Sequence, residues 1–420
     1  MGQNNDTKPR RRVLLSVLFT IFLDFFNLGL VYPIFSVACL GEEAFLGNSI
    51  PWMSQSVVYA LLVAAFPFGQ FIGAPVLGQY SDRYGRKPLL SISLIGSVIT
   101  LGMAGLSMQM YSLGLLLLAR FLGGVMAGNM TIAYASLTDL GSNENKVRNF
   151  ALVPLATGLG FTLGPYMASV FADSSYVSWF DLSTPFYAAA FFSVLNFALV
   201  QLFFIETLTK KNTESYFSFY TSISRLSQGV ISLDFRIPLL ILFLMVSANL
   251  SFVQFISLYA VSKFSIDISG LGALYTNIGI SVAIGHIFLT RTLASRFSIG
   301  QILPKSLALL AITLAIIGLT GSLLTLHCLT FFVMVSCAVA YSNTMAYVSN
   351  IASGSEQGKV MGMAVSIQSI AECLPPLVLG WSATYNPVFP LVISSLMAAL
   401  ALRLLRTTFS PGHSLCNPNN

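Results

Sequence analysis

The stretch Gly78–Leu90, GQYSDRYGRKPLL, gathers four charged residues between two long apolar runs. Gly85 permits the positive φ of a tight reversal, which other residues rarely adopt. Pro88 suits the first turn of a following helix, where its missing N–H is not needed. Gly78 allows the backbones of neighbouring helices to approach closely. The stretch therefore predicts a short turn between two membrane-spanning helices.

Composition predicts a membrane protein over the whole chain. Of the 420 residues, 55% are hydrophobic and 9% are charged, whereas a soluble protein carries about a quarter charged residues. A spanning helix needs roughly 20 apolar residues. Runs of that size lie at about 13–35, 53–78, 88–107, 111–138, 149–171, 184–205, 236–261, 269–290, 302–321, 325–349, 360–382 and 387–406. We expect an all-α membrane protein with twelve transmembrane helices. The first run lacks a small-residue cleavage site, so we expect it to be a retained spanning helix.

The basic residues predict the orientation of these helices. Of the 21 Lys and Arg residues, 19 fall in the terminal segments, the alternate loops and the linker that share one side. Lys263 falls on the other side, and Arg120 falls inside a run. Because Lys and Arg favour the cytoplasmic side, both termini are expected in the cytoplasm of a multi-pass protein of the cell (inner) membrane. The pI near 9.0 then reflects topology and does not indicate a nucleic-acid partner.

A polar connection divides the predicted helices into two sets of six. Its bounds, 207–235, leave an N-terminal half at 1–206 and a C-terminal half at 236–420. At an offset of 213 residues, Ser81–Gly85 aligns with Ala294–Ser298, and Lys146-Val147 aligns with Lys359-Val360. Two loops that agree on one offset indicate an internal duplication, as in transporters built from repeats.

Six motifs carry a resemblance to a known family. They are GQYSDRYGRK (78–87), FLDFFNLGLVYPIF (22–35), ARFLGGVMAGNMTIAYASLTD (119–139), RNFALVPLATGLGFTLGP (148–165), STPFYAAAFFSVLNF (183–197) and SEQGKVMG (355–362). With this order the chain resembles the major facilitator superfamily, and in particular its drug–proton antiporters of the tetracycline-efflux type. One departure is that Ala168 and Ser169 replace a Gly-Gly pair of the antiporter pattern.

The resemblance implies that the opening turn is a gate. Asp82 would face the start of the eleventh helix near 358–362, and Arg83 would reach Asp139. The two basic residues that follow would only anchor the loop at the membrane surface. The predicted gating residues are Gly78, Asp82, Arg83, Gly85, Arg86 and Asp139. The alternative is that every charge of this turn serves topology alone.

Three ionisable residues lie inside predicted spans: Asp24, Arg120 and Glu372. Each costs at least about 2.5–3.5 kcal/mol at a helix centre, so we expect them to serve proton coupling. Asp24 is the principal candidate, and its alternative is a permanent structural pair with Arg120. Arg120 either holds Asp24 ionised, binds an anionic substrate with its planar fork, or is structural. Glu372 precedes Pro375-Pro376, which should distort its helix.

Polar and aromatic residues inside the spans are candidates for lining a substrate cavity. They are Asn27, Tyr32, Asn129, Tyr134, Asn249, Gln254, Tyr275, Asn277, Tyr341, Asn343 and Tyr347. Such groups also serve as hydrogen-bonding partners between helices, and we read His286 as a packing residue.

The sequence predicts a secondary active transporter that works by alternating access. The leading hypothesis is proton-coupled export of amphipathic small molecules, and the alternative is proton-coupled import of a nutrient or metabolite. A third hypothesis is a receptor or scaffold that transports nothing and needs no buried acids. The five cysteines lack metal-ligand spacing, and nucleotide and catalytic motifs are absent, so we expect no enzyme, cofactor or metal. The expected partners are the substrate, protons and the lipid bilayer, with the protein acting as a monomer.

Overall fold

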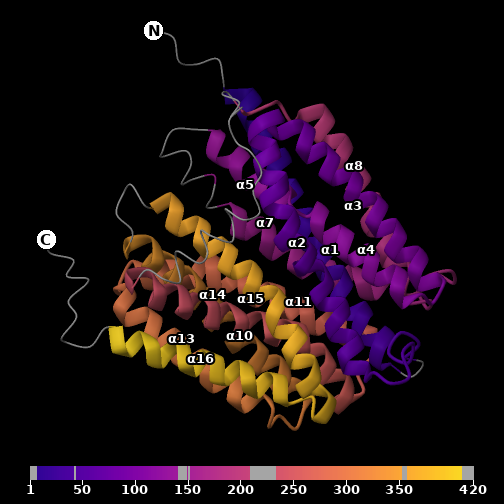
Figure 1. Ribbon diagram of the computed structural model, residues 1–420. Coiled ribbons are helices and arrows are strands. Elements are labelled where there is room, and N and C mark those ends of the chain that lie inside the picture. Colours follow the sequence, from indigo (N-terminus) through magenta and orange to yellow (C-terminus); the bar gives the residue numbers. More distant parts are fainter. Residues whose placement is uncertain are drawn as a thin grey trace, which may run out of the picture. The chain divides into compact units, whose positions relative to one another are not determined.

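A computed structural model describes residues 7–41, 44–140, 149, 152–208, 233–351 and 357–408. These residues are almost all helical, and Figure 1 shows the helices along the chain. The helices are α1 (Thr7–Leu40), α2 (Gln55–Tyr84), α3 (Arg86–Gln109), α4 (Leu113–Met126), α5 (Asn129–Asp139), α7 (Val153–Phe171), α8 (Thr184–Phe203), α10 (Leu233–Phe264), α11 (Ile268–Ile284), the π-helix η1 (Gly285–Thr290), α12 (Arg291–Ala294), α13 (Ile299–Ile317), α14 (Leu323–Ile351), α15 (Gln357–Tyr385) and α16 (Phe389–Thr408).

Each of the twelve apolar runs overlaps a helix in the described residues. Two runs are interrupted, one between α4 and α5 and the other where α11 passes into η1. In the described residues, ten helical segments are long and apolar enough to cross a membrane, and α7 and α15 are the two further long helices. The run at 111–138 breaks between α4 and α5, at Ala127-Gly128. A Cβ on Gly128 would lie 2.7 Å from Leu77 Cδ1, so the break brings the chain tightly against α2.

The contacts divide the chain into two compact units. The first is Met1–Phe219 with Ala260–Ala283, and the second is Tyr220–Tyr259 with Ile284–Asn420. The linker predicted at 207–235 lies largely outside the described residues, so the division into two six-helix halves stays a prediction.

Close helix contacts build the first unit. Within it, α1 packs against α7 and α8, α2 packs against α4, and α3 packs against α4 and α8 (Figure 1). Gly69 of α2 faces the backbone carbonyl of Phe121, and Gly124 of α4 faces the carbonyl of Phe66. Because neither position has room for a Cβ, glycine is what allows these two backbones to touch.

An apolar cluster supports the turn between α2 and α3. Leu77 of α2, Leu90 of α3 and Leu137 of α5 are all buried in it, together with Val17 of α1 and Val200 of α8. Five helices therefore converge beneath the turn and fix the ends of α3 and α5.

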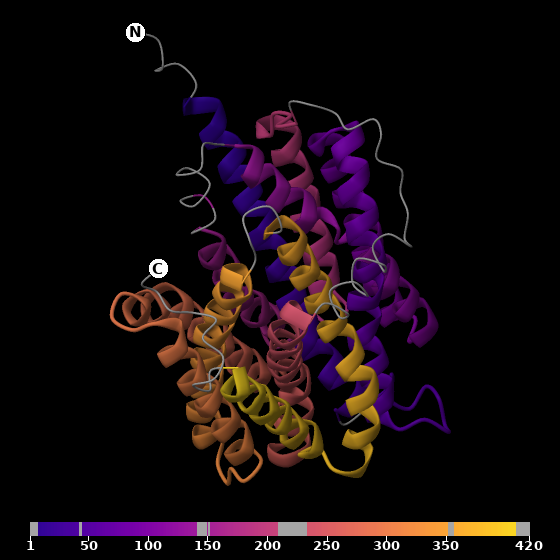
Figure 2. The same cartoon turned by 60° about the vertical axis from the view of Figure 1, so that its left-hand side comes forward.

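In the second unit, α13 packs against both α14 and α16, and α16 is the yellow helix of Figure 2. The hydroxyl of Tyr259 on α10 donates to the carbonyl of Ile317 at 3.2 Å, which ties α10 to the end of α13. The π-helix η1 lies against α14, where a Cβ on Gly285 would come within 2.6 Å of the Ala338 side chain.

Candidate functional site

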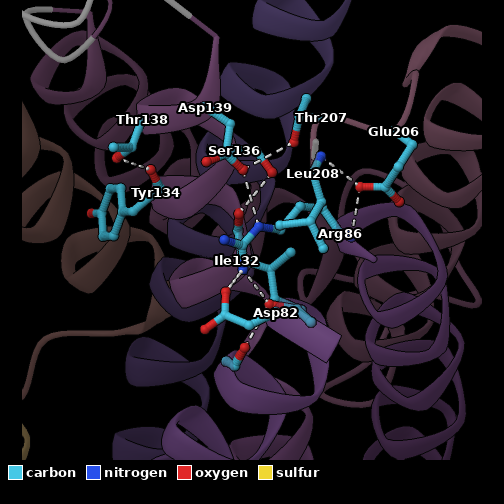
Figure 3. A network of polar contacts seen from close by, with 12 residues as sticks. Asp82, Arg86, Ile132, Tyr134, Ser136, Thr138, Asp139, Glu206, Thr207 and Leu208 are labelled. Atoms are coloured by element: carbon cyan, nitrogen blue, oxygen red, sulfur yellow. Dashed lines mark hydrogen bonds and ion pairs between the residues drawn. The ribbon is translucent and has the colours of Figure 1, made fainter. Parts of the chain in front are cut away.

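The turn between α2 and α3 is organised around Arg86. Arg86 Nη1 lies 2.6 Å from Asp82 Oδ1, and Arg86 Nε lies 3.1 Å from Asp139 Oδ2 (Figure 3). The same Nη1 donates to Ser81 Oγ at 2.6 Å. The Arg86 side chain is only 8% exposed, whereas those of Asp82 and Asp139 are 46% and 25% exposed. A buried guanidinium thus joins α2, α3 and α5.

Glu206, just beyond α8, caps the first turn of α3. Its carboxylate accepts from the backbone N–H of Arg86 at 2.9 Å (Figure 3). It also accepts from the backbone N–H of Lys87 at 3.1 Å. It also accepts from the N–H of Leu208 at 3.0 Å. A carboxylate at this place satisfies unpaired helix N–H groups and interacts favourably with the helix dipole. The sequence analysis missed Glu206, although a lone acid at the end of the sixth run was a signal for it.

Gly85 has the positive φ that the sequence predicted, with a value of 119°. A Cβ there would also lie 2.5 Å from Glu206 Oε2, so the cap and the backbone conformation both require glycine. At Gly78, a Cβ would lie 3.1 Å from Thr131 Cγ2, which agrees with the predicted close approach at this position.

The predicted pair of Arg83 with Asp139 is not formed in this structure. Asp139 binds Arg86 instead, and it also accepts from Thr207 Oγ1 at 3.3 Å. Arg83 lies at the end of α2 with its guanidinium carbon 5.5 Å from the centre of the Tyr84 ring. The physical reason is the reversal at Gly85, which turns Arg86 back toward the acids. Arg86 is therefore a buried partner of both acids and does more than anchor the loop at the surface.

Asp24, in the middle of α1, bonds to an amide. Asn129 Nδ2, at the start of α5, donates to Asp24 Oδ1 at 2.8 Å. Asp24 Oδ2 and Asn129 Oδ1 are buried and have no hydrogen-bond partner in the described part of the chain. The amide therefore engages one carboxylate oxygen and leaves the other available to a proton.

Arg120 occupies an aromatic setting on α4. Its guanidinium carbon lies 4.6 Å from the Phe66 ring centre and 5.3 Å from the Phe35 ring centre. The side chain is buried, and its Nε has no hydrogen-bond partner among the described residues. The alternative in which Arg120 is the structural partner of Asp24 is not what the structure shows, because the partner of Asp24 is Asn129. Cation–π attraction accounts for the position of this guanidinium.

Three further cavity candidates of the first unit are Asn27, Tyr32 and Tyr134. Asn27 Nδ2 donates to Ser193 Oγ of α8 at 3.3 Å. Tyr32 is buried and stacks on Tyr275 of α11, with ring centres 6.0 Å apart. Tyr134 on α5 is partly buried against the apolar cluster beneath the turn.

The candidates of the second unit form a separate set of contacts. Gln254 Nε2 donates to the backbone carbonyl of Glu372 at 3.4 Å, which links α10 to α15. Tyr341 donates to Gln368 Oε1 at 3.1 Å. Asn343 donates at 2.8 Å to the carbonyl of Val339 in its own helix, as a packing residue does.

Three further residues of the second unit that the sequence analysis singled out are Asn249, His286 and Glu372. Asn249 Oδ1 is buried with no hydrogen-bond partner in the described residues. His286 Nδ1 lies 3.1 Å from Ser342 Oγ, which satisfies it within the fold. Glu372 lies in a helix that runs without interruption through Pro375-Pro376, so the prolines do not break α15.

Residues 17–376 match the sequence profile described as Major Facilitator Superfamily. The chain belongs to the major facilitator superfamily. It is therefore a multi-pass membrane transporter with the twelve-helix fold of that family, and its members move small molecules. In the described residues, no group of three His, Cys, Asp or Glu side chains is placed to hold a metal ion.

Similar proteins within the superfamily are named for different activities, which include drug resistance and sugar–proton symport. The tetracycline resistance protein, class H, of Pasteurella multocida is 22% identical over 410 residues, which are 95% of each chain. The quinolone resistance protein NorA of Staphylococcus aureus (strain MSSA476) is 27% identical over 368 residues, which are 86% of this chain and 87% of NorA. The solved structure of a D-xylose–proton symporter is 15% identical, with a TM-score of 0.70 over 94% of this chain and 96% of the symporter.

Proposed function

We propose that this superfamily member exports amphipathic small molecules in exchange for protons, by alternating access. The observation that carries the proposal is the carboxylate of Asp24 in the middle of α1, bonded by Asn129 and left with one free oxygen. An ionisable acid at this depth is energetically costly, so its presence there favours a functional role. Relatives named for resistance to tetracycline and to quinolones favour export of an amphipathic drug-like compound.

Asn129 is suited to serve both protonation states of Asp24. Its Nδ2 donates to the carboxylate, and its Oδ1 has no other partner in the described residues. A rotation of the amide presents Oδ1 to the O–H of the protonated acid, because an amide carries both a donor and an acceptor. Asn129 can then keep one hydrogen bond to Asp24 both before and after the proton arrives.

The turn network supplies the proposed gate. Arg86 holds Asp82 through Oδ1, and the Asp82 side chain remains 46% exposed. We propose that Asp82 also meets the start of α15 in one state of the cycle, where the N–H groups of a helix end attract a carboxylate. Such a contact made in one state alone shifts the balance between the states.

Import in symport with protons remains the second candidate. It is favoured by Ala168 and Ser169, which stand where the antiporter pattern has two glycines. The Ser169 side chain lies against α11, since a Cβ on Gly272 would come within 2.7 Å of it. The larger residue on α7 is thus matched by a glycine on α11, so this packing differs from that of the antiporter pattern.

Proton flux in proteoliposomes tests the proposal and separates the two candidates. Purified protein is reconstituted with a pH-sensitive dye inside, and tetracycline, a quinolone and a sugar are added outside in turn. Protons that move opposite to the substrate support exchange, and protons that move with it support symport. Substrate movement that neither follows nor drives proton movement contradicts both.

Reconstitution at one protein per vesicle tests whether the monomer suffices for transport. Protease access tests the cytoplasmic placement of the termini in the cell membrane.

A further inference from the structure

A groove runs along α13 in the second unit and takes no part in the proposed transport. Its volume is about 260 Å³. Apolar side chains form most of its walls, including Leu289, Leu293, Ile302, Leu309, Val335 and Val339. Leu289 is 37% exposed and Leu309 is 42% exposed, so the groove opens to the outside of the unit. Sites that enclose a whole drug-sized ligand measure about 300–1,000 Å³, and this groove instead has room for a single chain.

The one charged side chain that lines the groove, Lys305, lies in the second turn of α13. Lys305 lines the groove, and its Nζ lies 5.9 Å from the centre of the Phe297 ring. Because Phe297 precedes α13, the lysine stem runs back along the helix and places the ammonium at that end. Arg296 is the exposed neighbour of Phe297. The groove therefore has a long apolar wall and a cationic end.

In the part of the chain that the structure describes, no acid forms an ion pair with this cationic end. Between Asp267 and Glu356 the sequence contains no Asp or Glu. The ion pairs of the described residues involve neither Lys305 nor Arg296. Cations that have no acidic partner at a membrane surface are available to the phosphates of lipids.

The internal repeat relates the loop before α13 to the loop before α3, and the two loops differ in charge. Arg86 begins α3 and Ile299 begins α13, and these positions lie 213 residues apart. At this offset Arg83 corresponds to Arg296, while Asp82 corresponds to Ser295. The loop of the first repeat carries an acid and a buried arginine that bind each other. In the second repeat both are replaced, and a cation remains exposed.

We propose that this groove binds an anionic phospholipid of the cytoplasmic leaflet, with one acyl chain along α13 and the phosphate between Lys305 and Arg296. The leaflet follows from the predicted orientation, which places both cations on the cytoplasmic side. Basic pockets between transmembrane helices on that side recognise anionic headgroups. A zwitterionic lipid offers the same acyl chain, but an ammonium group balances its phosphate and leaves the headgroup with no net charge. The net charge of the headgroup therefore decides between the two lipids.

Native mass spectrometry of the delipidated full-length protein tests the proposal. Phosphatidylglycerol and phosphatidylcholine with identical acyl chains are titrated separately, and the bound lipid is counted. We expect phosphatidylglycerol to bind more tightly, and the double variant Lys305→Ala/Arg296→Ala to weaken it roughly 10- to 30-fold, at about five-fold for each cation. Leu309→Trp fills the groove and should weaken the binding of both lipids.

The matched control is Arg403→Ala/Arg406→Ala, which removes two exposed cations from α16 on the same predicted side. This control should leave the tight phosphatidylglycerol site intact. Equal losses in the two double variants would overturn the proposal, because attraction would then depend on net charge alone. Equal binding of the two lipids to the unchanged protein would also overturn it. So would displacement of the bound lipid by a transported compound, because the groove would then be a substrate site.

Discussion

Arg86 Nε and Asp139 Oδ2 lie 3.1 Å apart and join the first residue of α3 to the last residue of α5. We predict that Arg86→Ala lowers the free energy of unfolding by about 1.5–3 kcal/mol, the contribution of a hydrogen bond to a charged group. Arg86→Lys should recover only part of the loss, because an ammonium cannot reproduce the planar fork. Thermal unfolding of the purified protein measures both.

Lys87→Ala is the matched control for Arg86. The Lys87 ammonium donates to the carbonyl of Gln201 at 3.0 Å from an exposed position, so its removal should cost much less. Equal unfolding midpoints for Arg86→Ala and Lys87→Ala would show that the turn is held by topology and by the apolar cluster alone.

The cap by Glu206 gives a second prediction. Glu206→Gln keeps one acceptor but places an NH₂ group near a backbone donor and removes the charge that the helix end attracts. We expect faster hydrogen exchange at the amides of Arg86 and Lys87, with a loss of about 1 kcal/mol in local stability. Exchange elsewhere in α3 should stay as it was. Unaltered exchange at those two amides would mean that water replaces the cap without cost.

The local features of the turn could be predicted from the sequence, and its long-range contacts could not. Gly85 and Pro88 report on their own backbone, so the reversal and the start of α3 followed from residue type. Glu206 lies about 120 residues away from the N–H groups that it caps. The choice between Arg83 and Arg86 as the partner of Asp139 depends on the direction in which each leaves the reversal.

The membrane-embedded residues show the same limit. Asp24 stood out as a costly acid in an apolar run, and the run itself predicted its helix. Its partner Asn129 was one of several polar residues within spans, and no local pattern joined the two. The break before Asn129 was also missed, because Ala127-Gly128 lies within a run that is apolar enough to span the membrane.

The packing of Ser169 against Gly272 gives a third prediction. A Cβ on Gly272 would lie 2.6 Å from Ser169 Oγ and 2.7 Å from Ser169 Cβ, so Gly272→Ala should cost about 1–3 kcal/mol through overpacking. Ser169→Gly removes the obstacle, and the double variant should regain most of the stability. A double-mutant cycle of unfolding free energies measures this coupling. Strictly additive effects would contradict the direct contact.

Asp181 gives a prediction of pH dependence outside the spans. Partial burial raises the pKa of its carboxyl, but hydrogen bonds from Ser183 and Thr184 outweigh the burial and hold the pKa below its ordinary value. A lowered folded-state pKa gives stability that is present above the unfolded value and is lost as the pH falls through the folded value. Asp181→Ala should therefore cost roughly 0.5–1 kcal/mol at neutral pH, as for an exposed helix cap, and the difference should shrink under acidic conditions. Unfolding of both proteins over the acidic range measures it, and a constant difference would contradict the assignment.

Asp24→Asn should abolish proton-coupled transport and leave the fold intact. The new amide has the same shape, and its oxygen can still accept from Asn129 Nδ2, the donor that lies 2.8 Å from Asp24 Oδ1. It cannot gain or lose a proton, so a pH gradient should no longer drive uphill movement, while exchange of substrate for substrate without a gradient should continue. Asp181→Asn makes the same chemical change outside the spans and should keep both activities. Proteoliposomes with and without an imposed pH gradient measure the two processes for each variant. Undiminished uphill transport by Asp24→Asn would contradict the role of Asp24 in proton coupling. Glu372 would then be the next acid to test, by Glu372→Gln.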